Sequence, residues 1–335
     1  MTNSPEPTVP RIAHGVDAQD HWSRRGWLSA AVAAGAFGGA TTGAMTAIAH
    51  SKDSTMREPF GYCLNTSTIR GQELPLPEEL QIAARAGYQG VEVWVGEIDG
   101  YVKNGGSIPE LAARASDLGL SIEGVIAFSE WIVDDEARRA KGLEDARRVL
   151  DLAAKIGAKR VAAPPAGAVD VALPSILTMA ERYRALLELG DAAGVVPQLE
   201  LWGFSQTLHR LGEVVAVALE AAHPEACVLL DVYHLYKGGS DVVGLKLLGG
   251  NAMHVLHMND YPATPPRAEI TDAHRVYPGD GVAPLGDILR SLREIGFRGM
   301  LSLELFNREL WKADAFLVAS EGLAKMRAAL AAALG

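Results

Sequence analysis

Short apolar stretches alternate with amphipathic segments from residue 59 onward, and this alternation limits the fold more than any other feature of the chain. Apolar runs of about four to eight residues, rich in β-branched side chains, are typical of buried strands. The expected strands are Phe60–Leu64, Gly90–Val95, Ser121–Phe128, Arg160–Ala163, Pro197–Trp202, Cys227–Asp231, Met253–Met258 and Met300–Leu305. Between them, Pro77–Ala86, Ile108–Leu118, Glu136–Ile156, Ser175–Ala193, Leu211–Ala222 and Leu285–Ile295 have the periodicity of helices. Such alternation predicts a parallel sheet.

Glycines follow several of the expected helices, at positions 87, 119, 157, 194 and 296. A glycine there takes the left-handed conformation that ends a helix and turns the chain toward the next strand. Eight such units in about 280 residues predict a single-domain (β/α)8 TIM barrel. A doubly wound open sheet is the alternative, but no glycine-rich phosphate motif follows the first expected strand.

The composition is that of a globular protein, with 48% hydrophobic and 21% charged residues among 335. A formal net charge of −10 and a pI near 5.4 argue against a nucleic-acid partner, because phosphate binding favours a basic face. A small molecule is the expected partner, and the sequence leaves homo-oligomerisation open. Cys63 and Cys227 lie in or beside apolar runs and are expected to be buried free thiols rather than a disulfide.

The segment before the expected barrel has its own pattern. Residues 23–29 read Ser-Arg-Arg-Gly-Trp-Leu-Ser, and residues 30–49 are uncharged and rich in Ala and Gly. This resembles a twin-arginine export signal ending near Ala47-Ile48-Ala49. Residues 1–49 are therefore expected to be a signal peptide, 50–58 a linker and 59–335 the barrel. The implied location is periplasmic or otherwise exported, with membrane contact only during export; an uncleaved anchor or a cytoplasmic helix are the alternatives.

Four chemically reactive side chains stand near the carboxyl ends of the last four expected strands. They are Glu200, Asp231, His257 and Glu304. Barrel enzymes place their chemistry at this end of the strands, and the last four expected strands contain no Lys or Arg to pair with the acids. The alternative for any one acid is an ion pair with a basic side chain, but four together predict a shared divalent metal. Three carboxylates and one imidazole suit Mn, Mg or Co and tolerate Zn.

With these residues the chain resembles the xylose-isomerase-like sugar isomerase and epimerase superfamily, which includes ketohexose 3-epimerases, hydroxypyruvate isomerase and inosose dehydratase. His234, three residues after Asp231, matches a histidine that contacts substrate in the epimerases, and Arg275, before Val-Tyr-Pro-Gly-Asp-Gly, matches a substrate-binding arginine. Many epimerases carry a second glutamate where this chain has Gln206, which we expect in an altered substrate pocket. The resemblance implies that Glu200 and Glu304 are metal ligands and also the catalytic acid–base pair.

The activity implied is isomerisation or epimerisation of an unphosphorylated sugar or keto-sugar, through an enediolate formed when a proton leaves carbon next to a carbonyl. A lyase or dehydratase acting on a 3-keto-glycoside or inosose is the alternative enzyme, because the same site permits β-elimination. A non-catalytic sugar-binding barrel is the alternative outside enzymes. The sequence has no Ser-centred elbow motif of a hydrolase.

Other residues have two interpretations. Glu92 could reach the pocket, although an inward structural hydrogen bond is favoured. Trp94, Trp131 and Trp202 could stack on a sugar, with core packing as the default. The proline-rich loop between His257 and Arg275 is expected to be either a lid or interface or a plain surface insertion.

Overall fold

The computed structural model describes residues 59–172 and 175–335. Its strands are β1 (Gly61–Asn65), β2 (Gly90–Trp94), β3 (Ser121–Ile126), β4 (Arg160–Ala163), β5 (Val196–Glu200), β6 (Val228–Asp231), β7 (Met253–Met258) and β8 (Met300–Leu303). Its α-helices are α1 (Leu76–Ala86), α2 (Val95–Lys103), α3 (Ile108–Asp117), α4 (Glu136–Lys155), α5 (Ile176–Ala193), α6 (Leu211–Glu220), α7 (Val232–Gly238), α8 (Leu285–Glu294) and α9 (Ala315–Leu334). Four 3-10 helices complete the described part: η1 (Thr66–Gln72), η2 (Val242–Leu247), η3 (Asp272–His274) and η4 (Leu310–Lys312).

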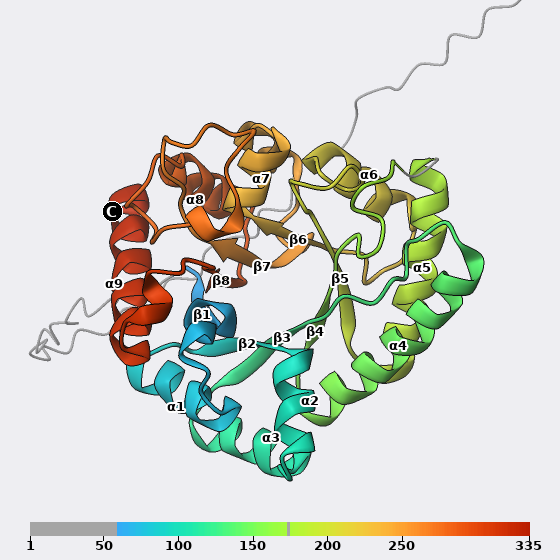
Figure 1. The fold of residues 1–335 in the computed structure, drawn as a ribbon. Coiled ribbons are helices and arrows are strands. Elements are labelled where there is room, and N and C mark those ends of the chain that lie inside the picture. Colours follow the sequence, from blue (N-terminus) through green and yellow to red (C-terminus); the bar gives the residue numbers. More distant parts are fainter. Residues whose placement is uncertain (1–58, 173–174) are drawn as a thin grey trace, which may run out of the picture. The chain divides into compact units, whose positions relative to one another are not determined.

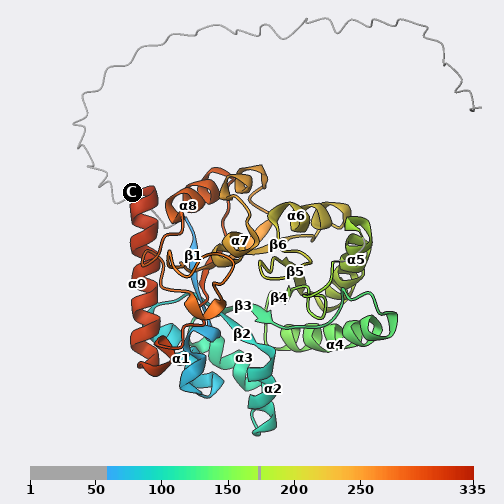
Figure 2. The ribbon, with the colours of Figure 1, turned by 45° about the horizontal axis from the view of Figure 1, so that its top comes forward.

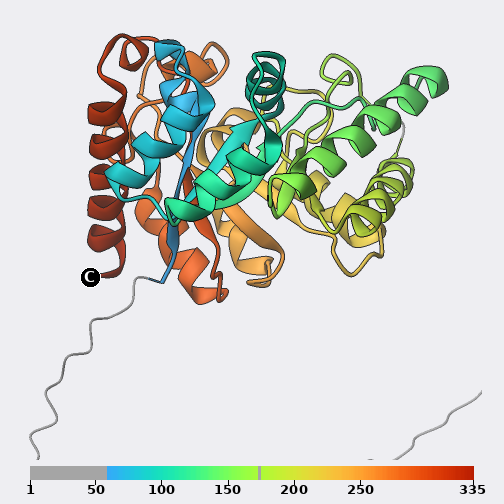
Figure 3. The ribbon, with the colours of Figure 1, turned by 90° about the horizontal axis from the view of Figure 1, so that it is seen from below.

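The strands form one closed parallel barrel in sequence order, and β8 pairs with β1 to complete the ring. Figure 1 looks along this ring and shows the helices outside it, and Figures 2 and 3 show the same arrangement from two further directions. The predicted (β/α)8 TIM barrel is therefore confirmed, and the open-sheet alternative is wrong.

The helix-ending glycines are where the sequence places them. Gly87 caps α1 with φ of 98°, and its N–H donates to the carbonyls of Ala83 and Ala84. Gly194 caps α5 in the same left-handed region, with φ of 70°. The other three expected positions, 119, 157 and 296, also have positive φ. A side chain would be strained at each, so the repeated glycine marks the repeated unit.

The expected strands differ from the observed ones mainly at their carboxyl ends. Phe128, Trp202 and Leu305 were expected within strands, but β3, β5 and β8 end two residues earlier. These residues lie where the chain leaves the ladder to form the mouth of the barrel. Helices α2, α7 and α9 are not among the segments that the periodicity singled out; α7 begins directly at the end of β6, and α2 contains two glycines.

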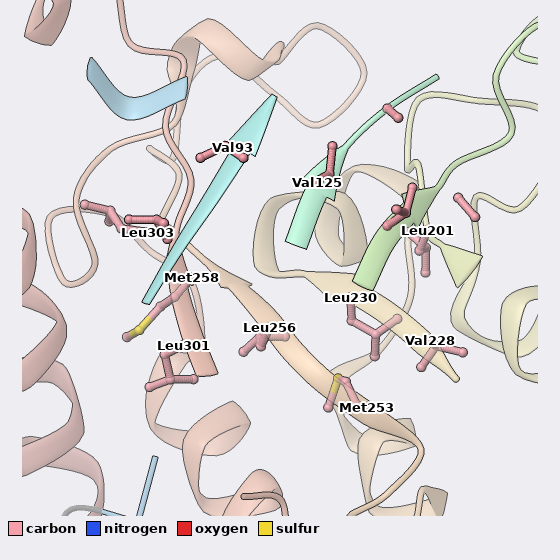
Figure 4. Packing of buried hydrophobic residues seen from close by; sticks show 14 of the residues in the cluster. Val93, Val125, Leu201, Val228, Leu230, Met253, Leu256, Met258, Leu301 and Leu303 are labelled. Atoms are coloured by element: carbon pink, nitrogen blue, oxygen red, sulfur yellow. The ribbon is translucent and has the colours of Figure 1, made fainter. Parts of the chain in front are cut away.

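Two apolar clusters hold the barrel together. The larger combines strand and helix side chains, and Figure 4 shows its part around β2, β3, β5, β6, β7 and β8. The smaller contains only strand residues: Ile126, Ala162, Leu229 and Val255, with Trp94 and Met300 packed against them. Because β3 and β4 lie across the ring from β6 and β7, this second cluster fills the barrel interior beneath the mouth. Cys63 and Cys227 are buried free thiols, as predicted.

The predicted signal peptide and linker, residues 1–58, lie outside the described residues. Within the part that is described, no helix combines the length and apolar character needed to span a bilayer.

Glu79 on α1 gives a prediction about stability. It is buried, and its Oε2 has no hydrogen-bond partner among the described residues. Burial, with the nearby charge of Glu97, raises the pKa of Glu79 to about 9. The folded protein therefore keeps a proton that the unfolded chain releases above about pH 4. It follows that the free energy of unfolding decreases as pH rises from about 5 to about 9.

We expect Glu79→Gln to flatten this pH dependence and to raise the melting temperature at about pH 9, because the amide needs no proton to be neutral. Thermal unfolding of the wild type and the variant across this range measures the difference. Glu78→Gln, next to it and exposed, is the matched control. A Glu79→Gln profile parallel to that of the wild type would contradict the assignment.

Candidate metal centre and active site

A pocket of about 560 Å³ opens at the carboxyl ends of the strands. Glu200 from β5, His234 from α7, Arg275 from the long loop and Glu304 after β8 all line it. Asp231 and His257 lie fully buried beside them. The structure thus brings together three of the four predicted metal ligands, Asp231, His257 and Glu304, and places Glu200 on the wall of the same pocket with two of the three predicted substrate-binding residues.

Local structure explains the Asp-x-x-His spacing. β6 ends at Asp231, and α7 starts at the next residue, so Asp231 is the N-cap of the helix. Its Oδ1 accepts from the backbone N–H of His234 at 2.8 Å, which satisfies one of the free donors of the first turn. The same carboxylate keeps Oδ2 directed at His257, whose Nδ1 is 3.8 Å away. One aspartate therefore starts the helix and takes part in the cluster.

Asp231, His257 and Glu304 each offer a ligand atom, and these atoms all lie within 4.8 Å of one another. His257 Nδ1 is 3.1 Å from Glu304 Oε2 but makes no well-formed hydrogen bond among the described residues. Its other nitrogen, Nε2, lies 3.1 Å from Glu92 Oε2. Burial opposes the charged form of His257, but the charges of Glu304 and Glu92 raise its pKa well above the usual value, so the ring carries both protons when no cation is bound. A cation bound at Nδ1 would replace one of these protons, and Glu92 would hold the other nitrogen, as carboxylates do for metal-binding histidines.

Glu92 has the structural role that the sequence favoured. It is fully buried, and its Oε2 accepts from Ser302 Oγ at 2.5 Å as well as facing His257. Asn65 and Asn259, which sequence reasoning missed, hold the other acids: Asn65 Nδ2 donates to Glu304 Oε1 at 3.1 Å, and Asn259 Nδ2 donates to Asp231 Oδ2 at 2.9 Å. Their positions in the sequence could have indicated a role in the site, because Asn65 ends β1 and Asn259 directly follows β7.

Glu200 and Glu304 are both buried, yet they differ in charge. Burial raises the pKa of Glu200 to about 8, opposed by His257 and reinforced by the charge of Glu304. Burial acts on Glu304 in the same direction, but His257 and Arg275 outweigh it and hold the pKa of Glu304 far below its usual range. When no cation is bound, Glu200 therefore keeps its proton to a much higher pH than Glu304 does, and such a difference lets two acids take opposite roles in proton transfer.

Arg275 is a basic partner of the acids that the sequence of the four strands did not predict. The four strands lack a cation, but Arg275 reaches in from the loop, and its Nη1 lies 2.8 Å from Asp231 Oδ2 and 2.7 Å from Glu304 Oε2. Its Nη2 pairs with Asp272 Oδ1 at 2.5 Å. The acids are therefore not without a basic partner, and their burial alone does not require a metal.

His234 stands against the same arginine. Arg275 Nη2 lies 3.1 Å from His234 Nε2, so Nε2 accepts and the ring is neutral. Burial lowers the pKa of His234, in agreement with that neutrality. The proton is then on Nδ1, which is buried and has no hydrogen-bond partner among the described residues. This donor is available to a ligand oxygen in the pocket.

The other residues that the sequence suggested for the pocket do not all line it. Gln206 is exposed and is not among the residues that line the pocket. Trp94 and Trp202 do line it, whereas Trp131 is a core residue whose Nε1 donates to the Pro164 carbonyl.

The long loop after β7 forms a wall of the pocket and is not a plain surface insertion. Lys237 Nζ donates to three of its carbonyls, those of Arg267, Ala268 and Ile270. Ile270 is fully buried. The loop is thus anchored on α7, and this anchoring delivers Arg275 to the acids.

The donor set fits a divalent cation. Glu200 Oε2 and His257 Nδ1 are buried atoms of ligand type without a hydrogen-bond partner among the described residues. The 3.1 Å between His257 Nδ1 and Glu304 Oε2 is a usual spacing for two atoms bound to one ion at about 2.1 Å each. Arg275 does not exclude this, because a carboxylate oxygen can accept more than one partner.

A closed parallel barrel whose acids and imidazole meet at the carboxyl ends of its strands defines the class: a (β/α)8 barrel with an enzyme-type pocket. Residues 80–329 match the family model described as the xylose isomerase-like TIM barrel. The chain belongs to this family.

Characterised relatives differ in activity. The chain is 25% identical over 260 residues to an inosose isomerase of Bacillus velezensis, covering 76% of this chain and 91% of that protein. It is 27% identical over 249 residues to a 3-dehydroshikimate dehydratase of Pseudomonas putida, covering 74% of this chain but only 39% of the dehydratase. A solved structure described as the IOLI protein with a binding zinc atom superposes with a TM-score of 0.76 at 21% identity, covering 82% of this chain and 99% of that one. These relatives include an isomerase and a dehydratase.

Proposed function

We propose that the chain is a metal-dependent isomerase or epimerase of an unphosphorylated sugar or keto-sugar. The observation that carries the proposal is the buried cluster of Asp231, His257 and Glu304, with Glu200 on the wall of the same pocket. Simple sugar binding does not need two buried carboxylates beside a buried imidazole.

The four residues would hold a divalent cation, with Mn, Mg or Co favoured by the oxygen-rich set and Zn tolerated. When bound, such a cation polarises a substrate carbonyl and acidifies the neighbouring C–H. Side chains of the protein carry out the proton transfers and hold the substrate oxygen. Glu304 and Glu200 are the acid–base pair, with the Glu304 carboxylate accepting the proton that leaves the substrate carbon, and the Nδ1–H of His234 donates to a substrate oxygen.

The second candidate is a lyase that eliminates water or an alcohol after the same proton removal, the leaving oxygen taking a proton as its bond to carbon breaks. The similarity to a dehydratase supports it. Gln206 favours neither reaction, because it is exposed and does not line the pocket. Both reactions begin with loss of a proton next to a carbonyl.

One experiment tests the proposal and separates the two reactions. Metal-loaded protein is incubated in heavy water with a panel of ketoses, inososes and 3-keto-glycosides, and the products are followed by NMR. Deuterium incorporation with an epimer or isomer supports the leading proposal, and an unsaturated product supports the lyase. Activity in fully chelated protein, or no exchange with any member of the panel, would reject the proposed function.

For location, we propose export, supported by the twin-arginine-like residues 23–49. N-terminal sequencing of the exported protein should begin near His50; a soluble cytoplasmic pool that retains Met1 would reject this.

A further inference from the structure

Five aromatic rings form a continuous arc on the wall of the pocket. They are Phe306, Trp94, Phe128, Trp202 and Phe204, which all line the pocket. Successive ring centroids are 5.9, 5.3, 5.7 and 5.2 Å apart, within the range of favourable aromatic pairs. We call this set the aromatic arc.

The arc and the acids occupy complementary parts of the barrel. The acids and the imidazole come from β5 to β8, whereas the arc runs from the end of β8 past β2 and β3 to the end of β5. Trp202 and Phe306 each stand two residues after a pocket acid, Glu200 and Glu304. A molecule held at the acids therefore has aromatic rings beside it.

The rings at the centre and end of the arc are exposed in a way that core packing does not explain. Phe128 and Phe204 each keep 43% of their surface accessible. Apolar surface left in water is unfavourable by about 25 cal/mol per Å². Exposed aromatic side chains gathered on the wall of one cavity are typical of a ligand-binding surface.

Trp94, the ring next to Phe306 in the arc, is held in place by two contacts. Trp94 Nε1 donates to Asn65 Oδ1 at 2.8 Å, and the Arg70 guanidinium carbon lies 3.7 Å from the centroid of the Trp94 ring. Because Asn65 also donates to Glu304, the same residue positions an acid and a ring of the arc. A preformed wall loses little conformational entropy when a ligand binds.

The pocket is larger than one sugar ring requires. At about 30 Å³ per water, its volume of about 560 Å³ corresponds to roughly 19 waters, and a hexose displaces about six of them. A single ring placed at the acids would leave room for a second ring in the pocket.

We propose that the aromatic arc is a subsite for a second flat ring, joined through a glycosidic oxygen to the sugar ring that reacts at the acids. This inference rests on the proposed function for the reacting ring and adds the substrate class: keto-glycosides that carry an aromatic group or a second sugar. Both groups have the apolar face that stacks on aromatic side chains. The free monosaccharide occupies only the part of the pocket at the acids.

Equilibrium binding tests the subsite without any turnover. Metal-loaded protein is titrated with methyl β-glucoside, phenyl β-glucoside and cellobiose, and affinity is measured by calorimetry. Stacking on two or more rings predicts an affinity for phenyl β-glucoside or cellobiose on the order of tenfold above that for the methyl compound. Preference for the phenyl compound identifies an aromatic group, and preference for cellobiose identifies a second sugar. Equal affinities for all three overturn the proposal.

Variants locate the binding gain. Phe128→Ala and Phe204→Ala should each reduce it several-fold, whereas Phe128→Tyr, which keeps the ring, should preserve it. Leu247→Ala, at a side chain 90% exposed on η2, is the control and should change nothing. A gain that persists in both alanine variants also overturns the proposal. Binding with the expected preference but no exchange on the keto-sugar panel would reject the proposed function alone, and exchange without the preference would reject the subsite alone.

Discussion

Glu304→Gln will reduce deuterium exchange at the substrate C–H by about 10²- to 10⁴-fold, the range that a general base contributes. The amide keeps the shape of the side chain but cannot accept the proton. Glu304 is the carboxylate of the pocket whose charge is stabilised by two basic groups, His257 and Arg275. Proton exchange in heavy water, followed by NMR on the best substrate of the panel, measures the loss.

Glu309→Gln is the matched control, because Glu309 is exposed and pairs only at the surface with Lys312. It should retain wild-type exchange. Circular dichroism and bound-metal content of Glu304→Gln show whether the fold and the cation remain. Unchanged exchange in a folded Glu304→Gln protein would remove this residue from the proton-transfer step.

The barrel could be predicted from the sequence because its determinants are local. Periodic apolar runs and a glycine after each of several helices act within a few residues, as at Gly87 and Gly194. Parallel strands in sequence order then bring their carboxyl ends to one side. For this reason alone Asp231, His257 and Glu304 could be expected to meet, although they are far apart in the chain.

The rest of the site depends on contacts that no local pattern encodes. Arg275 lies in a long loop, and its pairing with Asp231 and Glu304 follows from how Lys237 anchors that loop. Trp94 and Trp131 look alike in the sequence, but one lines the pocket and the other is core. Gln206 stands at the spacing of an epimerase substrate residue, yet the turn after β5 leaves it exposed.

Arg275 also links the cation proposal to stability. Its guanidinium is buried and paired with three carboxylates, and these charges raise its pKa further above the usual value despite burial. Breaking a buried ion pair by removing one partner costs about 3–5 kcal/mol, because the other charge is left uncompensated. In chelated protein, Arg275→Met should therefore lower the melting temperature by roughly 6–20 °C for a domain of this size.

Added Mn²⁺ should recover part of that loss, and this recovery is the informative measurement. In Arg275→Met the carboxylates of Asp231 and Glu304 lack their basic partner, so a cation bound by them replaces the missing charge. The metal-induced increase in melting temperature should then be larger in the variant than in the wild type. Arg290→Met, which removes only a surface pair with Asp287, should show neither effect. If Arg275→Met lowers the melting temperature by the same amount with and without Mn²⁺, the cation does not replace the charge of Arg275. That result would mean that the cation does not bind at Asp231 and Glu304.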